Sequence, residues 1–437
     1  MEEQKKLTLE TIVSLCKRRG FIFQAAEIYG GLNGVYDFGP LGVALKRKVQ
    51  NAWLKNITSF PETVVEFDGS ILGHSEVWKA SGHVSNFSDP MVDCNNCKKR
   101  FRSDEFDLTA GCPDCSSHKL TDPRQFQLMF QTQIGAMSDS TSIAYLRPET
   151  AQSIFVNFKN VVLTSRVKPP FGIAQIGKAF RNEITPRQFL FRVREFEQME
   201  MEFFCHPNDS DHYFQVWLER RQIFFLSLGL KSENLRQHAH DKAELSHYAR
   251  CCTDFQYQFP FGFKELEGLA HRTNFDLTAH GNASGKELSY HDALTGETFV
   301  PHVIESSVGV GRLLLTLLFN AYDEEVIDNE TRVVLRLKPM LAPVTAAVLP
   351  LVKKLSEPAE KLFFELKAQG FDVQFDESGS IGKRYRRQDE IGTPVCLTFD
   401  FDSLQDSMVT ARDRDTLEQT RIPLAKVANF LHDLLKR

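Results

Sequence analysis

The sequence predicts an α+β protein in which an antiparallel sheet flanked by helices precedes a smaller α/β domain. Residues 171–204 contain two runs of period-two alternation joined by a proline-containing loop, which indicates an antiparallel hairpin. From residue 338 onward, strand and helix patterns alternate, as is typical of an α/β domain. These observations predict two domains, at residues 1–337 and 338–437.

Composition is consistent with a globular chain. Of 437 residues, 42% are hydrophobic and 25% are charged, and the net charge of −5 gives no global basic field. The first residues lack an apolar segment and no run of 18 apolar residues occurs, which predicts neither secretion nor a membrane span. Nine cysteines, an odd number with two close pairs, favour a reducing compartment, and we expect the cytoplasm.

Two amphipathic helices are expected near the start of the chain. Residues 7–19 place four apolar side chains on one face: Leu9, Ile12, Val13 and Cys16. After Pro40, residues 41–57 carry apolar side chains at i+4 spacing: Leu41, Leu45, Val49, Trp53 and Ile57. This second pattern predicts a long helix facing a core.

Residues 85–125 form a cysteine-rich segment. Cys94 and Cys97 form one C-x-x-C pair, and Cys112 and Cys115 form another. Four thiolates at this spacing complete a tetrahedral shell, which predicts a structural zinc ion with no open coordination position. The alternative is four reduced, unliganded cysteines in a loop-rich insertion.

The predicted hairpin carries a mixed set of polar groups. Arg181 and Glu183 share one face of the first strand. On the returning strand, Arg192, Phe196 and Glu200 follow one another at roughly 13 Å intervals, at ~3.4 Å per residue. Guanidinium groups, an aromatic ring and carboxylates suit a ligand that has a phosphate, a flat base and an amine. The alternative is a solvated hairpin face of alternating charges.

Glu149 lies in the string Arg-Pro-Glu-Thr-Ala-Gln, where Pro148 is suited to start a helix. A carboxylate at that position is favoured by the helix dipole, and complementing the dipole is the simpler alternative role. Residues 205–258 contain no recognisable chemical motif. We expect them to be a helical insertion.

Residues 302–318 predict a strand followed by a buried helix. Glu305 and Ser307 share a strand face, and glycines at the turn permit close backbone approach. Arg312 lies in the first helical turn, where backbone N–H donors and the positive end of the helix dipole are also found. This combination favours the binding of a phosphate group. The alternative is an ordinary glycine turn into a core helix.

The C-terminal domain is expected to run strand, helix, strand, helix, strand. A last helix follows with one apolar face: Leu424, Val427, Leu431 and Leu434. Four basic residues surround Tyr385, namely Lys383, Arg384, Arg386 and Arg387. This group suits phosphates and a stacked base, although a basic solvated helix start is the alternative.

Several of these motifs together resemble one enzyme family. The pattern Phe-Arg-x-Glu (180–183), a loop, and Arg-x-x-x-Phe (192–196) resembles motif 2 of the class II aminoacyl-tRNA synthetases. The longer string FRNEITPRQFLFRVREFEQMEMEFF resembles glycyl-tRNA synthetases of the homodimeric type. Helix 41–57 is similar to motif 1, and residues 302–315 are similar to motif 3. The C-terminal domain resembles the anticodon-binding domain of glycyl-, threonyl-, prolyl- and histidyl-tRNA synthetases.

The resemblance implies roles for particular residues. Arg181 and Arg312 would be catalytic, and ATP would contact Arg181, Asn182, Glu183, Arg192, Val193, Phe196, Glu265, Leu266 and Arg312. Glycine would be held by Glu149, Glu200, Glu305 and Ser307. Glu265 would also be the ligand of Mg²⁺ bound with ATP, and Cys94, Cys97, Cys112 and Cys115 would hold Zn²⁺.

The implied partners are glycine, ATP, tRNA(Gly) and a second copy of the chain, with no membrane. Ser75 and Ser306 stand where the family has proline, and Lys264 stands where it usually has glycine. Two other functions fit the residues less well. One is a class II synthetase for another small amino acid, and the other is a non-catalytic, synthetase-like protein that binds nucleic acid.

Overall fold

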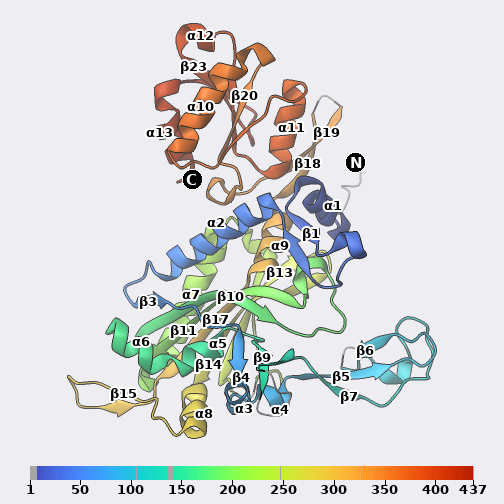
Figure 1. Cartoon of the computed structure of the whole chain (residues 1–437), viewed down its shortest axis with the longest axis vertical. Coiled ribbons are helices and arrows are strands. Elements are labelled where there is room, and N and C mark those ends of the chain that lie inside the picture. Colours follow the sequence, from blue (N-terminus) through green and yellow to red (C-terminus); the bar gives the residue numbers. More distant parts are fainter. Residues whose placement is uncertain (1–6, 105, 136–141, 247, 328, 437) are drawn as a thin grey trace.

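The computed structural model describes residues 7–104, 106–135, 142–246, 248–327 and 329–436. A seven-stranded sheet lies at the centre of the larger part, and a five-stranded sheet at the centre of the C-terminal part (Figure 1). The larger sheet has the order β12-β13-β14-β17-β11-β10-β3. Its strands span, in that order, Leu235–Ala239, Cys251–Phe259, Gly262–Thr273, His302–Gly309, Glu195–Cys205, Phe171–Phe180 and Thr63–Glu66.

The predicted hairpin is present as β10 and β11, which pair antiparallel with Gln175 opposite Glu200. On the other side of β11, strand β17 places Ser307 opposite Glu200, and β14 then places Gly268 opposite Ser307. Because side chains alternate between the faces of a sheet, Glu200, Ser307 and Gly268 form one row across one face. Residues distant in sequence therefore meet at mid-sheet.

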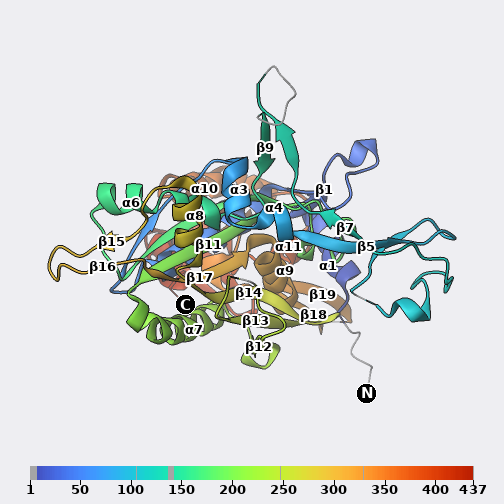
Figure 2. The same cartoon turned by 90° about the horizontal axis from the view of Figure 1, so that it is seen from below.

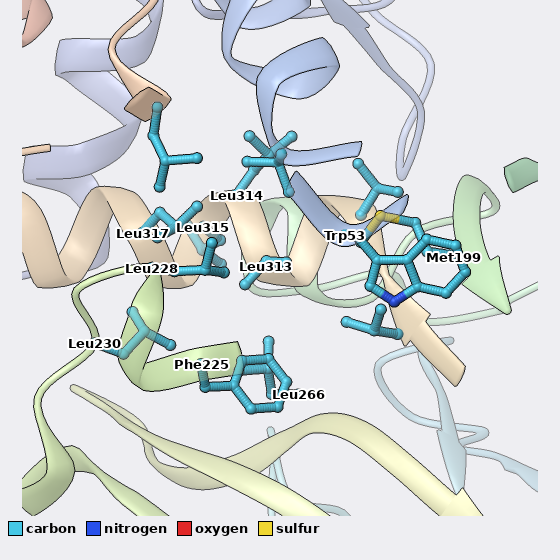
Figure 3. Close-up of a cluster of buried hydrophobic side chains, with 14 of the residues drawn as sticks. Trp53, Met199, Phe225, Leu228, Leu230, Leu266, Leu313, Leu314, Leu315 and Leu317 are labelled. Carbon is cyan, nitrogen blue, oxygen red and sulfur yellow. The ribbon is translucent and has the colours of Figure 1, made fainter. Parts of the chain in front are cut away.

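One face of the sheet is covered by helices α2 (Pro40–Ile57), α7 (Ser210–Ser227) and α9 (Val310–Ala321). Helix α2 confirms the long helix expected at 41–57, with Trp53 fully buried. Leucines of α9 approach Trp53, Met199 and Leu266 in this core (Figure 3). At ~25 cal/mol per Å² of buried apolar area, this layer supplies the main driving force that holds the sheet in place.

The opposite face is covered at one end only. Helices α5 (Ala151–Val156), α6 (Phe158–Ser165) and α8 (Phe275–Ser284) pack there around Phe171 and Phe204. The sequence predicts one helix from Pro148, but α5 begins after Thr150 and Asn157 separates it from α6. Since the aromatic cluster lies near the start of β10 and the end of β11, the other end of this face is left uncovered.

The expectation of a helical insertion over residues 205–258 is wrong in part. Helix α7 occupies residues 210–227, but residues 235–239 and 251–259 are strands β12 and β13 of the central sheet. Thr253, Phe255 and Tyr257 alternate with polar residues, and their side chains are buried. This segment is therefore part of the sheet rather than an appendage to it.

Smaller elements project from the larger part. Helix α1 (Leu9–Arg19) begins after Thr8, which caps it, and ends at Gly20. Strands β5 (Ser88–Asp93), β6 (Arg100–Arg102) and β7 (Arg124–Gln127) form the cysteine-rich module, which projects from one side (Figure 1). Strands β4 (Leu72–His74), β9 (Ile143–Leu146) and β8 (Gln131–Gln133) form another small sheet. In the view of Figure 2, β5 and β7 point away from hairpin β15 (Tyr290–His291) and β16 (Thr298–Phe299).

The C-terminal domain has its own core beneath a sheet of order β21-β20-β22-β23-β24. The predicted alternation is present as β20 (Ala346–Pro350), α10 (Ser356–Ala368), β21 (Val373–Phe375), α11 (Ile381–Ile391) and β22 (Val395–Phe399). Two further strands, β23 (Met408–Asp413) and β24 (Gln419–Pro423), precede helix α13 (Val427–Leu434). Hairpin β18 (Tyr322–Ile327) and β19 (Glu330–Leu335) connects the two parts of the chain.

Tyr385 and two of the four basic residues around it, Arg384 and Arg387, make contacts inside this domain. The Tyr385 hydroxyl bonds to Thr398, and buried Arg384 donates to the carbonyl oxygens of Pro350 and Leu351. Arg387 pairs with Asp376 at 2.6 Å. The expectation that Tyr385 stacks on a base is therefore wrong, because its ring packs against the sheet. Among the helices that the structure describes, none has both the length and the apolar character needed to cross a membrane.

Candidate active site

A cavity of about 490 Å³ occupies the uncovered end of the central sheet. Its floor comes from strands β11, β13, β14 and β17, and its rim comes from the loop after β10 and the start of α9. Most residues predicted to bind ATP or glycine line this cavity: Glu149, Arg181, Glu183, Arg192, Val193, Phe196, Glu200, Glu265, Glu305, Ser307 and Arg312. The structure thus brings both predicted groups into one space.

Two of the predicted ATP residues lie elsewhere. The Leu266 side chain is buried in the hydrophobic core (Figure 3) and does not line the cavity. Asn182 does not line the cavity, and its backbone N–H donates to the Leu128 carbonyl oxygen at 2.7 Å. Alternation of the strand turns the Leu266 side chain toward the core, so only the backbone of Leu266 can face the cavity, and its contact with ATP stays a prediction.

Arg181 lies just beyond the end of β10, not within the strand as expected. Its backbone N–H still donates to the Arg194 carbonyl oxygen at 2.8 Å, which extends the hairpin ladder by one step. Its guanidinium carbon is 5.2 Å from the ring centre of Phe196 and 5.3 Å from that of Phe87. Two aromatic rings and the Pro148 carbonyl oxygen therefore fix this positive charge at the cavity wall.

Glu183 and Arg192 also lie in the loop between β10 and β11 rather than on the strands. This loop contains the short 3₁₀ helix Phe189–Phe191, and an isolated bridge pairs Arg187 with Arg192. The Arg194 side chain leaves the cavity and donates to the carbonyl oxygens of Glu183 and Asn33 at 2.8 Å. The loop is consequently anchored from behind while Glu183 and Arg192 line the cavity.

Arg312 occupies the first turn of α9, as the sequence predicts. It pairs with Glu265 at 3.0 Å, and its guanidinium carbon is 4.5 Å from the ring centre of Phe191. The charge of Arg312 holds the pKa of Glu265 below its ordinary value, against the opposing effect of burial. Glu265 is therefore an ionised carboxylate beside a phosphate-sized positive site.

Three carboxyl groups meet at the other end of the cavity. Glu200 accepts hydrogen bonds from the Thr150 backbone N–H at 2.9 Å and from the Thr150 hydroxyl. Glu149 pairs with His83 at 3.2 Å, and Glu305 pairs with Arg272 at 2.8 Å. This end of the cavity therefore carries more carboxyl groups than fixed positive charges, an arrangement that favours a cationic guest.

The three carboxyl groups differ in their pKa values. Burial, together with the nearby charges of Glu305 and Glu149, raises the pKa of Glu200 to about 8. Burial also raises the pKa of Glu305, although Arg272 offsets part of that effect. For Glu149 the effect of burial is outweighed by His83 and Arg272, so its pKa lies below the ordinary value. A cation that enters this space would therefore ionise Glu200.

Sequence reasoning missed several residues that shape the acidic end. Arg272 is buried and pairs with both Asp276 and Glu305, and the Gln198 amide donates to the Ser307 hydroxyl at 3.1 Å. The Tyr248 ring lies 3.8 Å from the Arg272 guanidinium carbon and closes the cavity wall. The ion pair of Arg272 with Asp276 joins the end of β14 to the start of α8. Nothing local in the sequence indicated this pair or Tyr248.

The structure explains why serine is tolerated at the two positions, 75 and 306, where the family has proline. Ser75 is the first residue of the short helix α3 (Ser75–Ala80), a position that accepts proline and serine alike. The Ser306 hydroxyl donates to the buried Glu267 carboxylate at 2.6 Å, and Glu267 pairs with Arg221 at 2.7 Å. Ser306 therefore points away from the cavity and helps to satisfy a buried ion pair.

The four cysteines of the projecting module gather at one point. The sulfur atoms of Cys94 and Cys115 are 3.7 Å apart, and those of Cys97 and Cys112 are 3.6 Å apart. A tetrahedral zinc ion with Zn–S bonds of about 2.3 Å separates its sulfurs by about 3.8 Å. The donor set and its spacing therefore fit zinc.

A mostly antiparallel sheet with arginines at one end of its cavity, acids at the other and a separate C-terminal α/β domain defines a class II aminoacyl-tRNA synthetase. Residues 135–321 match the family model for the "tRNA synthetase class II core domain (G, H, P, S and T)", and residues 345–434 match that for the "Anticodon binding domain".

Full-length relatives define the family more narrowly. The chain is 51% identical to a glycine–tRNA ligase of Caldanaerobacter subterraneus subsp. tengcongensis, over 99% of both chains. It is 51% identical to that of Treponema denticola, over 99% of this chain and 98% of the relative, and 52% identical to that of Borrelia hermsii, over 97% of both. The chain belongs to the glycine–tRNA ligase family.

Proposed function

We propose that this chain activates glycine with ATP to form glycyl-adenylate and then transfers the glycyl group to the 3′ end of tRNA(Gly). One observation carries the proposal: a single cavity has guanidinium groups at one end and three carboxyl groups, two of them buried, at the other. The first end suits phosphates and the second suits the ammonium group of a small amino acid.

ATP would lie along the sheet with its phosphates at the arginine end. Phe196 would offer a face for adenine, Glu183, which lines the same cavity, would orient the base edge, and Arg181 would hold the α-phosphate. Arg192 and Arg312 would bind the outer phosphates. Mg²⁺, when bound with ATP, neutralises phosphate charge, and Glu265 is the residue that would hold it.

Activation needs no nucleophilic side chain. A carboxylate oxygen of glycine bonds to the α-phosphorus while the bond from that phosphorus to pyrophosphate breaks. The tRNA terminal hydroxyl then attacks the glycyl carbonyl carbon, and AMP leaves. The protein contributes by aligning the reactants and stabilising the charge on the phosphorus, for which Arg181 is the main candidate.

Selection of glycine would rest on the acidic end. Glu149, Glu200 and Glu305, with the Ser307 hydroxyl, would bind the ammonium group. A larger amino acid must be excluded by lack of room, because one methyl group in an adaptable pocket changes binding by only about 1–3 kcal/mol. The Tyr248 ring, which packs on Arg272 and lines the cavity, would exclude larger side chains.

The primary test is ATP–pyrophosphate exchange with glycine, alanine and serine compared at equal concentration. We expect exchange with glycine only. Arg181→Ala should abolish exchange while the circular dichroism spectrum stays unchanged, because the guanidinium lies at the cavity wall and not in the core. Exchange at the wild-type rate in that variant would remove Arg181 from the mechanism, and preferred exchange with serine or alanine would reassign the substrate.

A non-catalytic, nucleic-acid-binding role is the competing function. It is disfavoured because Arg181, Glu183, Arg192 and Arg312 all line the same cavity. We further propose that the chain acts as a homodimer in the cytoplasm with one structural zinc ion on Cys94, Cys97, Cys112 and Cys115. Sedimentation equilibrium tests the dimer, and a monomer at micromolar concentration with full activity would contradict it.

A further inference from the structure

A second group of metal-binding side chains lies on the cavity wall, apart from the cysteine-rich module. His240, Cys252 and Asp254 each offer one donor atom, and these atoms all lie within 4.8 Å of one another. The His240 Nε2 atom is 3.0 Å from an Asp254 carboxylate oxygen, and the Cys252 sulfur is 4.0 Å from the other oxygen. All three residues line the cavity.

The sheet explains why these donors meet. Cys252 and Asp254 are two residues apart on β13, so both side chains point to the cavity face. His240 follows the end of β12, and its backbone N–H donates to the Cys252 carbonyl oxygen at 2.9 Å. On the neighbouring strand, Ala270 lies opposite Cys252 and Gly268 opposite Asp254. These two small residues leave room beside the donors.

We propose that His240, Cys252 and Asp254 form a second metal site that binds a zinc-class divalent cation and leaves one coordination position open to the cavity. Tetrahedral coordination with bonds of about 2.0–2.3 Å places donor atoms about 3.3–3.8 Å apart, so small side-chain rotations bring these three donors into place. Binding would replace the Cys252 thiol proton, which passes to solvent. Three protein ligands and an open position are the arrangement of an exchangeable site rather than a structural one.

This site differs in chemistry from the proposed magnesium position. Imidazole and thiolate ligands select zinc or cobalt, whereas Mg²⁺ prefers oxygen ligands such as the Glu265 carboxylate. Asp254 lies in the same row of the sheet as Gly268, Ser307 and Glu200. At ~4.8 Å between strands, Asp254 is roughly 10 Å from Ser307. A bound zinc ion would therefore narrow the substrate cavity and inhibit glycine activation, a consequence that rests on the proposed function.

The chain supplies a matched control for this site in the adjacent Cys251. Cys251 lies opposite His271 on the face turned toward the core, and it is partly buried like Cys252. Full-length protein, loaded with one equivalent of zinc to fill the cysteine-rich module, is titrated with Co²⁺ as the probe. The wild type, Cys252→Ser, His240→Gln and Cys251→Ser are compared, after circular dichroism and melting curves verify folding.

We expect the wild type to bind one further equivalent of Co²⁺ with a sulfur-to-cobalt charge-transfer band. Cys252→Ser should lose that band, both Cys252→Ser and His240→Gln should bind at least tenfold more weakly, and Cys251→Ser should match the wild type. No further equivalent in the wild type, or an equal loss in Cys251→Ser and Cys252→Ser, would overturn the site.

A separate assay tests whether zinc inhibits glycine activation. Glycine-dependent ATP–pyrophosphate exchange is measured with and without added Zn²⁺, and each rate is divided by the rate of the same variant in chelator. Inhibition in the wild type and in Cys251→Ser, but not in Cys252→Ser, is expected. Cobalt binding without zinc inhibition would overturn the inhibitory consequence alone. Cobalt binding by a protein that has no glycine-dependent exchange would overturn the proposed function while the metal site stands.

Discussion

Glu200 is 1% exposed and lies between two other carboxyl groups, yet it accepts two hydrogen bonds from Thr150. Those hydrogen bonds favour the carboxylate, while burial and the neighbouring charges favour the acid. The second influence is larger, since the pKa rises to about 8. An arriving ammonium group reverses the balance, so glycine binding and ionisation of Glu200 are coupled.

Glu200→Gln should weaken glycine binding by at least tenfold and leave ATP binding nearly unchanged. In the wild type, glycine affinity should rise as the pH increases from 6.5 through 8, because more Glu200 is ionised before binding. The variant should lose this part of the pH dependence. Isothermal titration calorimetry measures both effects. Glu195→Gln is the control, because Glu195 lies at the start of the same strand and pairs with Lys178. Equal glycine affinity in Glu200→Gln and the wild type would contradict the assignment.

The same carboxyl group predicts how stability changes with pH in the absence of glycine. Its pKa is about 8 in the folded chain and about 4.3 in an unfolded one, so the folded state holds the extra proton between those values. The folded state therefore loses stability as the pH rises through this range. Between pH 5 and 8.5, the melting temperature should fall less steeply with pH in Glu200→Gln than in the wild type. An equal fall in both proteins would contradict the raised pKa of Glu200.

At the level of single residues, the sequence was sufficient where a motif names the residue type and spacing. Arg181, Glu200 and Arg312 were predicted in that way and line one cavity. Arg272 was not, because a buried ion pair depends on partners that the fold brings together. The core-side position of Glu267 could not be predicted, because the irregular pairing of β14 with β13 between Glu265 and Glu267 interrupts the alternation of the strand.

Secondary structure was predicted best where a regular spacing of apolar side chains extended over several turns. Helix α2 shows five apolar residues at i+4 spacing, and its bounds follow that pattern. The helical pattern of the preceding segment favours a helix, whereas the alternation of Thr253, Phe255, Tyr257 and Phe259 with polar residues is the signal of strand β13. Helix α5 begins after Thr150, later than the proline rule indicates, and the Thr150 backbone N–H donates to the Glu200 carboxylate.

Helix α2 depends on a close approach at Gly42. A Cβ atom there would lie 1.9 Å from the Phe21 carbonyl oxygen, so Gly42→Ala must displace the helix that carries Trp53. We expect it to lower the free energy of unfolding by about 1–3 kcal/mol. Gly382, in the first turn of α11, has nothing within 4 Å of its added Cβ, and Gly382→Ala should stabilise by about 0.5–1 kcal/mol. Urea denaturation of the two variants tests the contrast, and equal effects would contradict it.

The cysteine-rich module contains few buried apolar side chains, so the metal is expected to be its main source of stability. Cys112→Ser should reduce the zinc content measured by atomic emission and should open the module to proteolysis between residues 94 and 120. The melting transition of the central sheet should change little, because the module projects away from that sheet (Figure 1). Retention of zinc and of protease resistance in Cys112→Ser would exclude the four-cysteine site.

At the scale of the whole molecule, several ion pairs of the described residues join the two domains. Buried Arg332 of β19 pairs with Asp389 of α11 at 2.7 Å, and Arg336 pairs with Asp415 at 3.0 Å. Glu390 of α11 accepts hydrogen bonds from Arg19 at 2.5 Å and from Arg18 at 3.1 Å, both in α1. Lys48 of α2 pairs with Asp372 at 2.8 Å. The two hydrophobic cores are separate over most of their extent, so these ion pairs contribute to the orientation of the C-terminal domain.

The orientation matters for the second half of the proposed reaction only, because glycine activation takes place within one domain. Glu390→Gln removes the charge that two arginines share at a half-buried position, and we expect ATP–pyrophosphate exchange to stay within twofold of the wild type. Charging of tRNA should instead fall about three- to tenfold in kcat/KM, chiefly through a higher KM for tRNA, because the anticodon-binding surface would be held less firmly.

Asp406→Asn is the matched control, since Asp406 pairs with Arg421 inside the C-terminal domain at 2.6 Å and does not join the two domains. It should leave both assays unchanged. A parallel loss of exchange and charging in Glu390→Gln would indicate that α1 transmits strain to the catalytic sheet. An unchanged KM for tRNA would indicate that the connecting hairpin β18–β19 alone sets the domain orientation, because that hairpin packs against α11 as well.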